Sequence, residues 1–276
     1  MPRNAPEISG VKYVQLDLND ESSLRNLFST RNIDSVFHTA AAGVSTQDEH
    51  LREIFSINTV GTGLLGNAAL KAKVRSFIYL GSAFEYGSSN VPLTEESLVK
   101  PVNLYGASKA AGWMVLDTLY RLQGLPLMSI RVFTTYGPGE QKKKLVPYVI
   151  HNLLNHNPVL LTSGQQIRDY LFIDDLIEAT IKVWSLNKPG EIFNVGGSQE
   201  SAIQIRELVE QIVIMSGAPL NLCQFGDAQR TRHDPPYLVA DVRKINNLTG
   251  WKANTPLEMG LHQTIQHVKQ SMLIEL

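Results

Sequence analysis

The chain has 276 residues, and 43% of them are hydrophobic, which is enough apolar material for one large domain or two smaller ones. Its 25 Lys and Arg residues nearly balance its 26 Asp and Glu residues, so net charge does not draw it to nucleic acid or to an anionic membrane. The single cysteine excludes an internal disulfide framework and a zinc site of several cysteines, and no apolar stretch approaches the roughly 18 residues of a membrane-spanning helix. We therefore expect a cytoplasmic globular protein.

Short apolar runs rich in β-branched and aromatic residues alternate along the chain with longer segments that have helical spacing. The expected strands are residues 11–16, 35–38, 76–80, 127–133 and 191–195. The expected helices among them are residues 51–72, 109–123 and 174–184. This alternation predicts βαβ crossovers, and runs that are apolar throughout are typical of strands buried on both faces. The sequence therefore predicts an α/β fold with a parallel sheet.

The pattern becomes less regular after residue 133. A loop with Gly137, Pro138 and Gly139 comes next, and further helices are expected over residues 145–155, 201–215 and 256–268. This part is typical of a smaller domain at the carboxyl end of the sheet. That edge is where open α/β sheets bind ligands.

Residues 61–66 have the pattern G-x-G-x-x-G, which is found in dinucleotide-binding turns. Such a turn follows a strand and opens a helix, so that backbone N–H groups meet the pyrophosphate. Here the preceding residues, HLREIFSINTV, have helical spacing. We therefore interpret the glycines as small residues that let one helix pack against another.

Tyr105 and Lys109 are the first residues that point to chemistry. At a spacing of i and i+4 they share one helix face, and a nearby ammonium lowers the pKa of a phenol. Ser82 follows the expected strand 76–80, so its hydroxyl lies at the ligand edge, where it can hydrogen-bond a reacting oxygen. Because this spacing is common on helices, the alternative is a surface Tyr and Lys without a catalytic role.

Nine short motifs follow one another along essentially the whole chain. They are LDLND (16–20), HTAA (38–41), NTVGT (58–62), GSAFEYG (81–87), PLTEESLVKPVNLYGASK (92–109), RVFTTYGPGEQ (131–141), GQQIRDYLFIDD (164–175), NVGG (194–197), and ADVRK (240–244) through GW (250–251). In this order they resemble the extended short-chain dehydrogenase/reductases. Within that superfamily they resemble the NAD-dependent epimerase/dehydratase family that acts on nucleotide sugars.

The resemblance implies a Rossmann-like, doubly wound parallel sheet with a small C-terminal substrate-binding domain. Residues 1–139 and 169–197 would form the dinucleotide-binding domain, and residues 140–168 and 198–276 the substrate-binding domain. It also implies NAD or NADP as cofactor, a nucleotide-sugar substrate, and a homodimer formed through helices 51–72 and 109–123.

Carried over residue by residue, the resemblance makes Tyr105 the general acid/base. Lys109 would lower its pKa and bind the nicotinamide ribose, and Ser82 would orient the sugar hydroxyl or keto oxygen. The other implied cofactor residues are Asp17 and Leu18 near adenine, His38, Ala40 and Ala41 along the dinucleotide, and Asn58 in support of them.

Arg168 stands where the family contacts the substrate diphosphate, and Arg230 or Arg232 would be a second arm. A guanidinium suits phosphate because it donates two parallel hydrogen bonds. The alternative for Arg168 is a structural ion pair with Asp169 or Asp174. The alternative for the other two arginines is a solvated loop charge.

Two departures from the family pattern bear on the activity. Dehydratases of this family carry an acidic pair immediately after the catalytic Thr, whereas this chain has Ala83 and Phe84 there. Glu85 is shifted by one position and would point to the opposite face if the strand continued. This argues against a 4,6-dehydratase. Thr134, on the substrate side, stands where 4-epimerases often have Asn, so a 4-epimerase and a 4-ketoreductase both stay open.

The front of the chain departs furthest from the family. Members begin with a strand, a glycine-rich turn, a helix and a second strand, and a βαβ unit takes about 30 residues or more. Only ten residues precede the expected strand 11–16, and they contain no such turn. In the order 3-2-1-4-5-6 the two absent strands would lie between strands 11–16 and 35–38, which would split the sheet.

This departure has two interpretations. We favour a sequence that begins downstream of the native start, because the later catalytic set is intact. The alternative is a catalytically silent binding or regulatory protein on a degenerate Rossmann scaffold that has lost cofactor binding.

Overall fold

The central sheet has four parallel strands in the order β1-β2-β3-β8. The computed structural model describes residues 8–43, 50–226, 228 and 234–274. The strands are β1 (Ser35–His38), β2 (Ser76–Ser82), β3 (Leu127–Val132) and β8 (Ile192–Val195). β2 and β3 are buried along nearly their whole length, as their apolar sequences require. The predicted parallel sheet is therefore confirmed.

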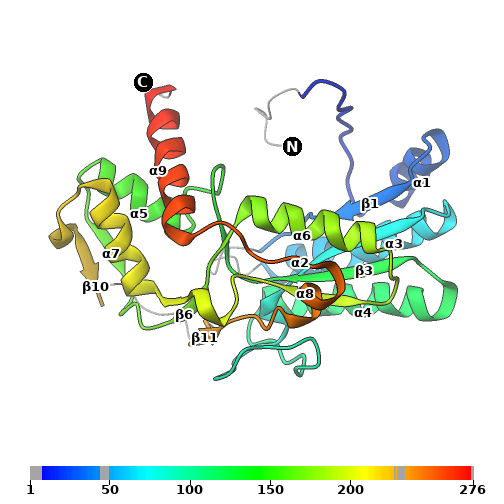
Figure 1. Ribbon diagram of the computed structural model, residues 1–276. Coiled ribbons are helices and arrows are strands. Elements are labelled where there is room, and N and C mark those ends of the chain that lie inside the picture. Colours follow the sequence, from blue (N-terminus) through cyan, green and yellow to red (C-terminus); the bar gives the residue numbers. More distant parts are fainter. Residues whose placement is uncertain (1–7, 44–49, 227, 229–233, 275–276) are drawn as a thin grey trace.

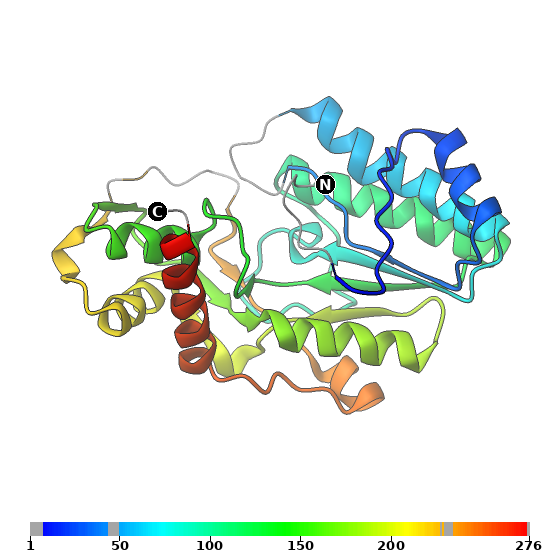
Figure 2. The ribbon, with the colours of Figure 1, turned by 90° about the horizontal axis from the view of Figure 1, so that it is seen from above.

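Helices cover both faces of this sheet, as Figure 2 shows. One face carries α1 (Glu21–Thr30), α3 (Thr62–Lys71) and α4 (Leu104–Gln123), and the other carries α6 (Ile173–Leu186) and α8 (Arg243–Thr249). Because side chains alternate along a strand, β2 contributes to two cores. Phe77 and Tyr79 pack toward α3 and α4, whereas Ile78 packs with Phe193 and Trp251 toward α6 and α8.

The expected helix 51–72 is interrupted by a π-helical segment. It consists of α2 (Leu51–Phe55), the π-helix η1 (Ser56–Gly61) and α3. A Cβ atom added at Gly61 would lie 2.8 Å from Leu18 Cβ, and one at Gly63 would lie 2.9 Å from Val115 Cγ1. One at Gly66 would overlap the side chain of Leu116 on α4. Gly63 and Gly66 therefore let α3 pack against α4, as predicted, whereas Gly61 lies against Leu18 in the loop before α1.

A smaller part at the carboxyl end of the sheet has its own core, formed by α5, α7 and α9 (Figure 1). These helices are Leu145–Leu154, Ile205–Ser216 and Leu257–Ile274. Short strands join them in three small sheets: β4 (Thr135–Tyr136) with β7 (Leu171–Phe172), β5 (Val159–Leu161) with β10 (Cys223–Phe225), and β6 (Ile167–Asp169) between β9 (Ala202–Gln204) and β11 (Tyr237–Leu238). Two 3-10 turns, η3 (Gln199–Ser201) and η4 (Leu220–Leu222), complete this part.

The exact domain division stays a prediction, and one detail of it differs from the structure. α8 packs against β8 and α6, and Ile245 and Trp251 belong to the core of the central sheet. The segment around α8 therefore lies with the sheet, although we had assigned all of residues 198–276 to the smaller domain.

The expected strand at residues 11–16 is wrong. This segment has no regular secondary structure, and residues 11–15 are exposed. In Figure 1 it is the dark blue trace that extends away from the sheet. Its apolar residues suit a strand, but a strand also needs a neighbour that takes its backbone hydrogen bonds. Within the described residues, β1 pairs only with β2, and residues 11–16 pair with neither.

No helix in the described part of the chain is both long enough and apolar enough to cross a lipid bilayer.

Candidate active site

Ser82 is the last residue of β2 and begins the 3-10 turn η2 (Ala83–Glu85). Its Oγ accepts a hydrogen bond from the backbone N–H of Phe84 at 3.3 Å. α4 begins close by, where the Asn103 side chain accepts from the N–H of Gly106 at 2.7 Å. A Cβ atom at Gly106 would overlap the carbonyl oxygen of Phe84, so glycine lets the first turn of α4 approach η2. Tyr105 lies in that turn.

The Ser82 side chain lies close enough to Tyr105 to act on the pKa of its phenol. Burial raises the pKa of Tyr105 to about 12, the contact with Ser82 opposes this rise, and the charge of Glu85 adds to it. The lowering effect comes from Ser82, and the predicted effect of Lys109 on this pKa stays a prediction.

Lys109 lies one turn further along α4 and is almost fully buried. Its ammonium lies 4.4 Å from the centre of the Tyr79 ring, and the Tyr79 hydroxyl donates a hydrogen bond to the Lys109 carbonyl oxygen at 2.9 Å. Burial lowers the pKa of Lys109 to about 8, and the charge of Glu85 opposes this change. Lys109 therefore changes its charge state close to neutral pH.

Asn58 joins three parts of the site from within the π-helical segment η1. Its side-chain amide accepts from the N–H of Ala42 at 2.8 Å and donates to the Ala42 carbonyl oxygen at 2.8 Å. It also donates to Ser108 Oγ at 2.9 Å, and this hydroxyl in turn donates to the Tyr105 carbonyl oxygen. Asn58 thus links the loop after β1 to the first turn of α4 and so helps to hold these two segments together.

The His38 side chain is buried among its neighbours and is not exposed at the carboxyl edge of the sheet. Its Nε2 is 2.8 Å from Thr62 Oγ1, and its ring contacts the rings of Phe77 and Tyr79. Burial lowers its pKa to about 3, and the charge of Lys109 adds to this effect. The predicted contact of His38 with a cofactor stays a prediction.

The other predicted cofactor residues lie on or near the surface. Ala40 and Ala41 are exposed just after β1, at the same edge of the sheet as Ser82. Asp17 is exposed, and Leu18 packs against Gly61. Thr134, predicted on the substrate side, is half-buried just after β3 at this same edge.

Arg168 lies on β6 and is almost fully buried. Its Nη2 donates to Asp234 Oδ1 at 2.6 Å and to the Pro235 carbonyl oxygen at 2.7 Å. Its ion pair is thus with Asp234 and not with Asp169 or Asp174. Arg230 and Arg232 lie outside the described residues.

The spacing of residues in the sequence did not reveal the buried ion pair of Glu85 and Arg131, which lies beneath this site. Glu85 Oε2 lies 2.8 Å from Arg131 Nε, and both side chains are nearly inaccessible to solvent. We had expected Glu85 to point away if the strand continued. Instead β2 ends at Ser82, and η2 turns the carboxylate back toward the Ser82 N–H. A charged residue just after an apolar strand is the signal in the sequence that could have indicated this pair.

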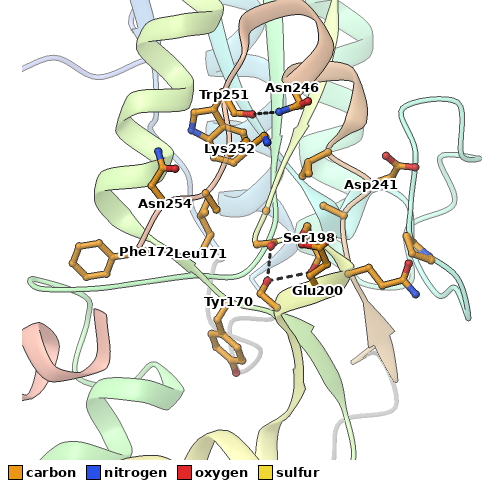
Figure 3. A pocket seen from close by; sticks show the side chains of 18 of the residues that line it. Tyr170, Leu171, Phe172, Ser198, Glu200, Asp241, Asn246, Trp251, Lys252 and Asn254 are labelled. Atoms are coloured by element: carbon orange, nitrogen blue, oxygen red, sulfur yellow. Dashed lines mark hydrogen bonds between the residues drawn. The ribbon is translucent and has the colours of Figure 1, made fainter. Parts of the chain in front are cut away.

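A cavity of about 1230 Å³ lies elsewhere, between β7, the loop after β8 and the chain on either side of α8. Figure 3 shows it, with Trp251 and Asn246 at one end and Tyr170 at the other. None of the three predicted catalytic side chains lines this cavity. Among the described residues, no cluster of His, Cys, Asp and Glu side chains could hold a metal ion.

Known proteins resemble this chain along most of its length. The sequence model of the NAD dependent epimerase/dehydratase family matches residues 2–196. The dTDP-D-glucose 4,6-dehydratase of Homo sapiens is 31% identical over 267 residues, which cover 94% of this chain and 75% of that protein. The UDP-glucuronate 4-epimerase of Thermodesulfobacterium geofontis is 29% identical over 267 residues, which cover 95% and 80%. The solved structure of MoeE5 in complex with UDP-glucuronic acid and NAD has a TM-score of 0.89 at 27% identity, covering 98% of this chain and 89% of that one.

The chain therefore belongs to the NAD-dependent epimerase/dehydratase family. The resemblance noted in the sequence is confirmed, and so is the Rossmann-like arrangement of a parallel sheet between two layers of helices.

Proposed function

We propose that the protein is an NAD(P)-dependent enzyme that moves a hydride at C4 of a nucleoside-diphosphate sugar, as a 4-epimerase or a 4-ketoreductase. The observation that carries this proposal is that Ser82 ends β2 at the carboxyl edge of the sheet, where the turn after it meets the first turn of α4, which holds Tyr105 and, one turn further on, Lys109. Family membership supports it, because relatives are named for reactions of dTDP- and UDP-linked sugars.

In this proposal Tyr105 moves the proton of the reaction. Its phenol oxygen takes the proton from the C4 hydroxyl as the sugar is oxidised, or returns it as the 4-keto group is reduced. Ser82 orients the same sugar oxygen by a hydrogen bond. Lys109, when charged, favours the phenolate form of Tyr105. The dinucleotide, when bound, supplies the hydride acceptor or donor.

The residues present fit the nicotinamide half of such a cofactor. Ala40 and Ala41 are small and exposed at the edge that carries Ser82, so a flat ring can approach the backbone there. Lys109 would bind the ribose next to Tyr105, and Asn58 supports this arrangement through Ala42 and Ser108. Asp17 and Leu18 would lie near the adenine.

The turn after Ser82 argues against a 4,6-dehydratase, although several relatives carry that name. Elimination of water needs an acid and a base beside the sugar, and the two positions after Ser82 are a buried Ala83 and an apolar Phe84. Phe84 instead packs edge-on against the Tyr105 ring, with ring centres 6.2 Å apart. Glu85 is held by Arg131 and is not free to serve the sugar.

Arg168, with Arg230 or Arg232, is proposed to bind the diphosphate of the substrate. Arg168 donates hydrogen bonds to Asp234 and to the Pro235 carbonyl oxygen. Its guanidinium must therefore give up some of these bonds in order to bind phosphate oxygens. Thr134 would contact the sugar from the end of β3.

A homodimer is part of the proposal. Apolar side chains are exposed on the two helical segments expected to pair: Leu51, Val60, Met114 and Val115. Burying such side chains against a second copy would remove this apolar surface from water.

A second candidate function is a silent binding or regulatory protein. The observation that favours it is the burial of Tyr105, which raises the pKa of its phenol to about 12 and so hinders proton transfer near neutral pH.

Product analysis tests the proposal. The protein would be incubated with UDP-, dTDP-, CDP- and GDP-hexoses, and with their 4-keto derivatives, together with NAD or NADPH, and the products followed by NMR. We expect a change at C4 with the C6 hydroxyl retained. A 4-keto-6-deoxy product would contradict the proposed reaction. If the protein neither binds nor converts any of these nucleotide sugars, the result would favour the catalytically silent protein.

A further inference from the structure

One buried tyrosine contacts both the main chain and the charged end of Lys109. Tyr79 lies on β2, three residues before Ser82, and is fully buried. Its hydroxyl donates a hydrogen bond to the Lys109 carbonyl oxygen at 2.9 Å, and the centre of its ring lies 4.4 Å from Lys109 Nζ. A single side chain on the sheet therefore holds the lysine at two points.

The ring of Tyr79 supplies a partner that a buried ammonium needs. Lys109 is only 1% exposed, so its charged group has lost most of its hydration. An aromatic face attracts a cation, and the attraction is stronger where water is excluded. Because a lysine has a flexible four-carbon stem, such a contact also decides where its charge lies.

The hydroxyl contact depends on how closely α4 approaches β2. A Cβ atom at Gly112 would come 3.2 Å from the Tyr79 hydroxyl oxygen, so glycine leaves the room in which this hydroxyl reaches α4. Within an α-helix each carbonyl oxygen already accepts from the N–H four residues later. The bond from Tyr79 is thus an additional one for the Lys109 carbonyl, and it fixes α4 at this residue relative to the strand.

Filling the core does not by itself require a tyrosine at position 79. Phe77 points from β2 into the same core, two residues earlier, and is equally buried. The rings of both residues contact His38. A phenylalanine therefore satisfies this face of the sheet, and what distinguishes Tyr79 is its pair of contacts with Lys109.

We propose that Tyr79 is a positioning residue for Lys109: its hydroxyl fixes α4 at the lysine, and its ring holds the ammonium on the helix face shared with Tyr105. Because Ser82 lies on the same strand, β2 sets the positions of both groups. The catalytic meaning of this inference rests on the proposed function. The two contacts themselves can be tested without substrate or cofactor.

The ring contact is tested by NMR of the whole chain with lysines labelled at Cε, and a Lys109→Arg variant assigns the signal. Protons held over an aromatic face resonate upfield because the ring current opposes the applied field. We therefore expect the Cε protons of Lys109 upfield of those of exposed lysines. Tyr79→Phe keeps the ring and should keep this shift, whereas Tyr79→Leu should remove it.

Phe77→Leu is the matched control for the loss of a buried ring. It removes a ring from the same face of the same strand and should lower the melting temperature to a similar extent, but it should leave the Lys109 signal in place. If Tyr79→Leu does not fold, Tyr79→Met fills more of the space without a ring and gives the same measurement. A Lys109 signal that stays upfield in whichever of these two folds would overturn the ring contact.

The hydroxyl contact is tested by the carbonyl carbon of Lys109, labelled and assigned in the same way. Accepting a hydrogen bond moves the signal of a carbonyl carbon downfield. In Tyr79→Phe the Lys109 carbonyl signal should therefore move upfield, while in Phe77→Leu it should not. An unchanged signal in Tyr79→Phe would overturn this part of the proposal.

Turnover tests the catalytic meaning of the two contacts. On a nucleotide sugar that the wild-type protein converts, Tyr79→Leu or Tyr79→Met should lower kcat by about 10–100-fold, and Tyr79→Phe should retain most of the wild-type value. Equal losses in Tyr79→Leu and Phe77→Leu would reduce Tyr79 to a packing residue. Absence of turnover in every protein would instead count against the proposed function, and the NMR signals would still decide the two contacts.

Discussion

His38 is a histidine that its surroundings keep uncharged. It is the last residue of β1, its ring contacts Thr62 on α3, and burial lowers its pKa from 6.5 to about 3. In the unfolded chain the His38 ring takes up its proton as the pH falls through about 6.5. In the folded chain it does so only near pH 3. His38 therefore contributes stability that is fully present above pH 6.5 and is lost as the pH falls toward 3.

This linkage predicts that the wild-type protein loses stability at acidic pH and that a His38→Gln variant lacks this part of the loss. Between pH 7 and pH 5 the wild-type free energy of unfolding should fall by about 2 kcal/mol more than that of His38→Gln. Urea unfolding of both proteins at several pH values measures the difference. Parallel curves for the two proteins would show that His38 is not held neutral in the fold.

At the scale of elements, the site depends on how closely α4 approaches the π-helical segment η1. A Cβ atom at Gly112 on α4 would overlap the carbonyl oxygen of Asn58, a backbone atom that cannot move aside like a flexible side chain. The neighbouring Asn58 amide joins Ala42 to Ser108. Gly112 is therefore required by this contact and not by any turn.

Gly112→Ala should lower the free energy of unfolding by about 1–3 kcal/mol, because overpacking outweighs the helix propensity gained from alanine. Gly63→Ala is the matched control: its Cβ would meet the side chain of Val115, which is partly exposed and can shift. Urea unfolding of both variants provides the measurement. Equal stability of the two would contradict the close packing described for Gly112.

The sequence predicted the central strands because each is a short run rich in apolar, β-branched and aromatic residues, and β2, β3 and β8 are also largely buried on both faces. Ser35–His38 was predicted to the residue, and β2, β3 and β8 to within two. The same reasoning failed at residues 11–16, because pairing with a neighbour and not composition decides whether a run becomes a strand. The π-helical segment was also beyond prediction, since Asn58 bonds there to residues 16 and 50 positions away.

The candidate site could be located from the sequence, but its electrostatics could not. Ser82, Tyr105 and Lys109 were identified by motif and spacing. The Glu85–Arg131 pair spans 46 residues, and Asp234, the partner of Arg168, lies 66 residues away. Contacts of that separation follow from tertiary packing, which local patterns do not contain.

At the scale of the whole molecule, the predicted catalytic groups lie where the sheet domain faces the smaller part of the chain. β2 brings Ser82 to the carboxyl edge, α4 brings Tyr105 and Lys109 to the same place, and Arg168 comes from β6 in the smaller sheets. In the proposed function a nucleotide sugar would have its sugar at Ser82 and Tyr105 and its diphosphate at Arg168. The central claim is therefore that Tyr105 moves a proton for a nucleotide sugar bound across this edge.

The most direct test of this claim compares Tyr105→Phe with the wild-type enzyme on its nucleotide-sugar substrate at pH 7. Phenylalanine keeps the ring and removes the hydroxyl that moves the proton. We predict that kcat falls by about 10²–10⁴-fold while the Kd for the nucleotide sugar, measured by calorimetry, stays close to wild type. A kcat near the wild-type value would contradict the account and move the chemistry to another residue.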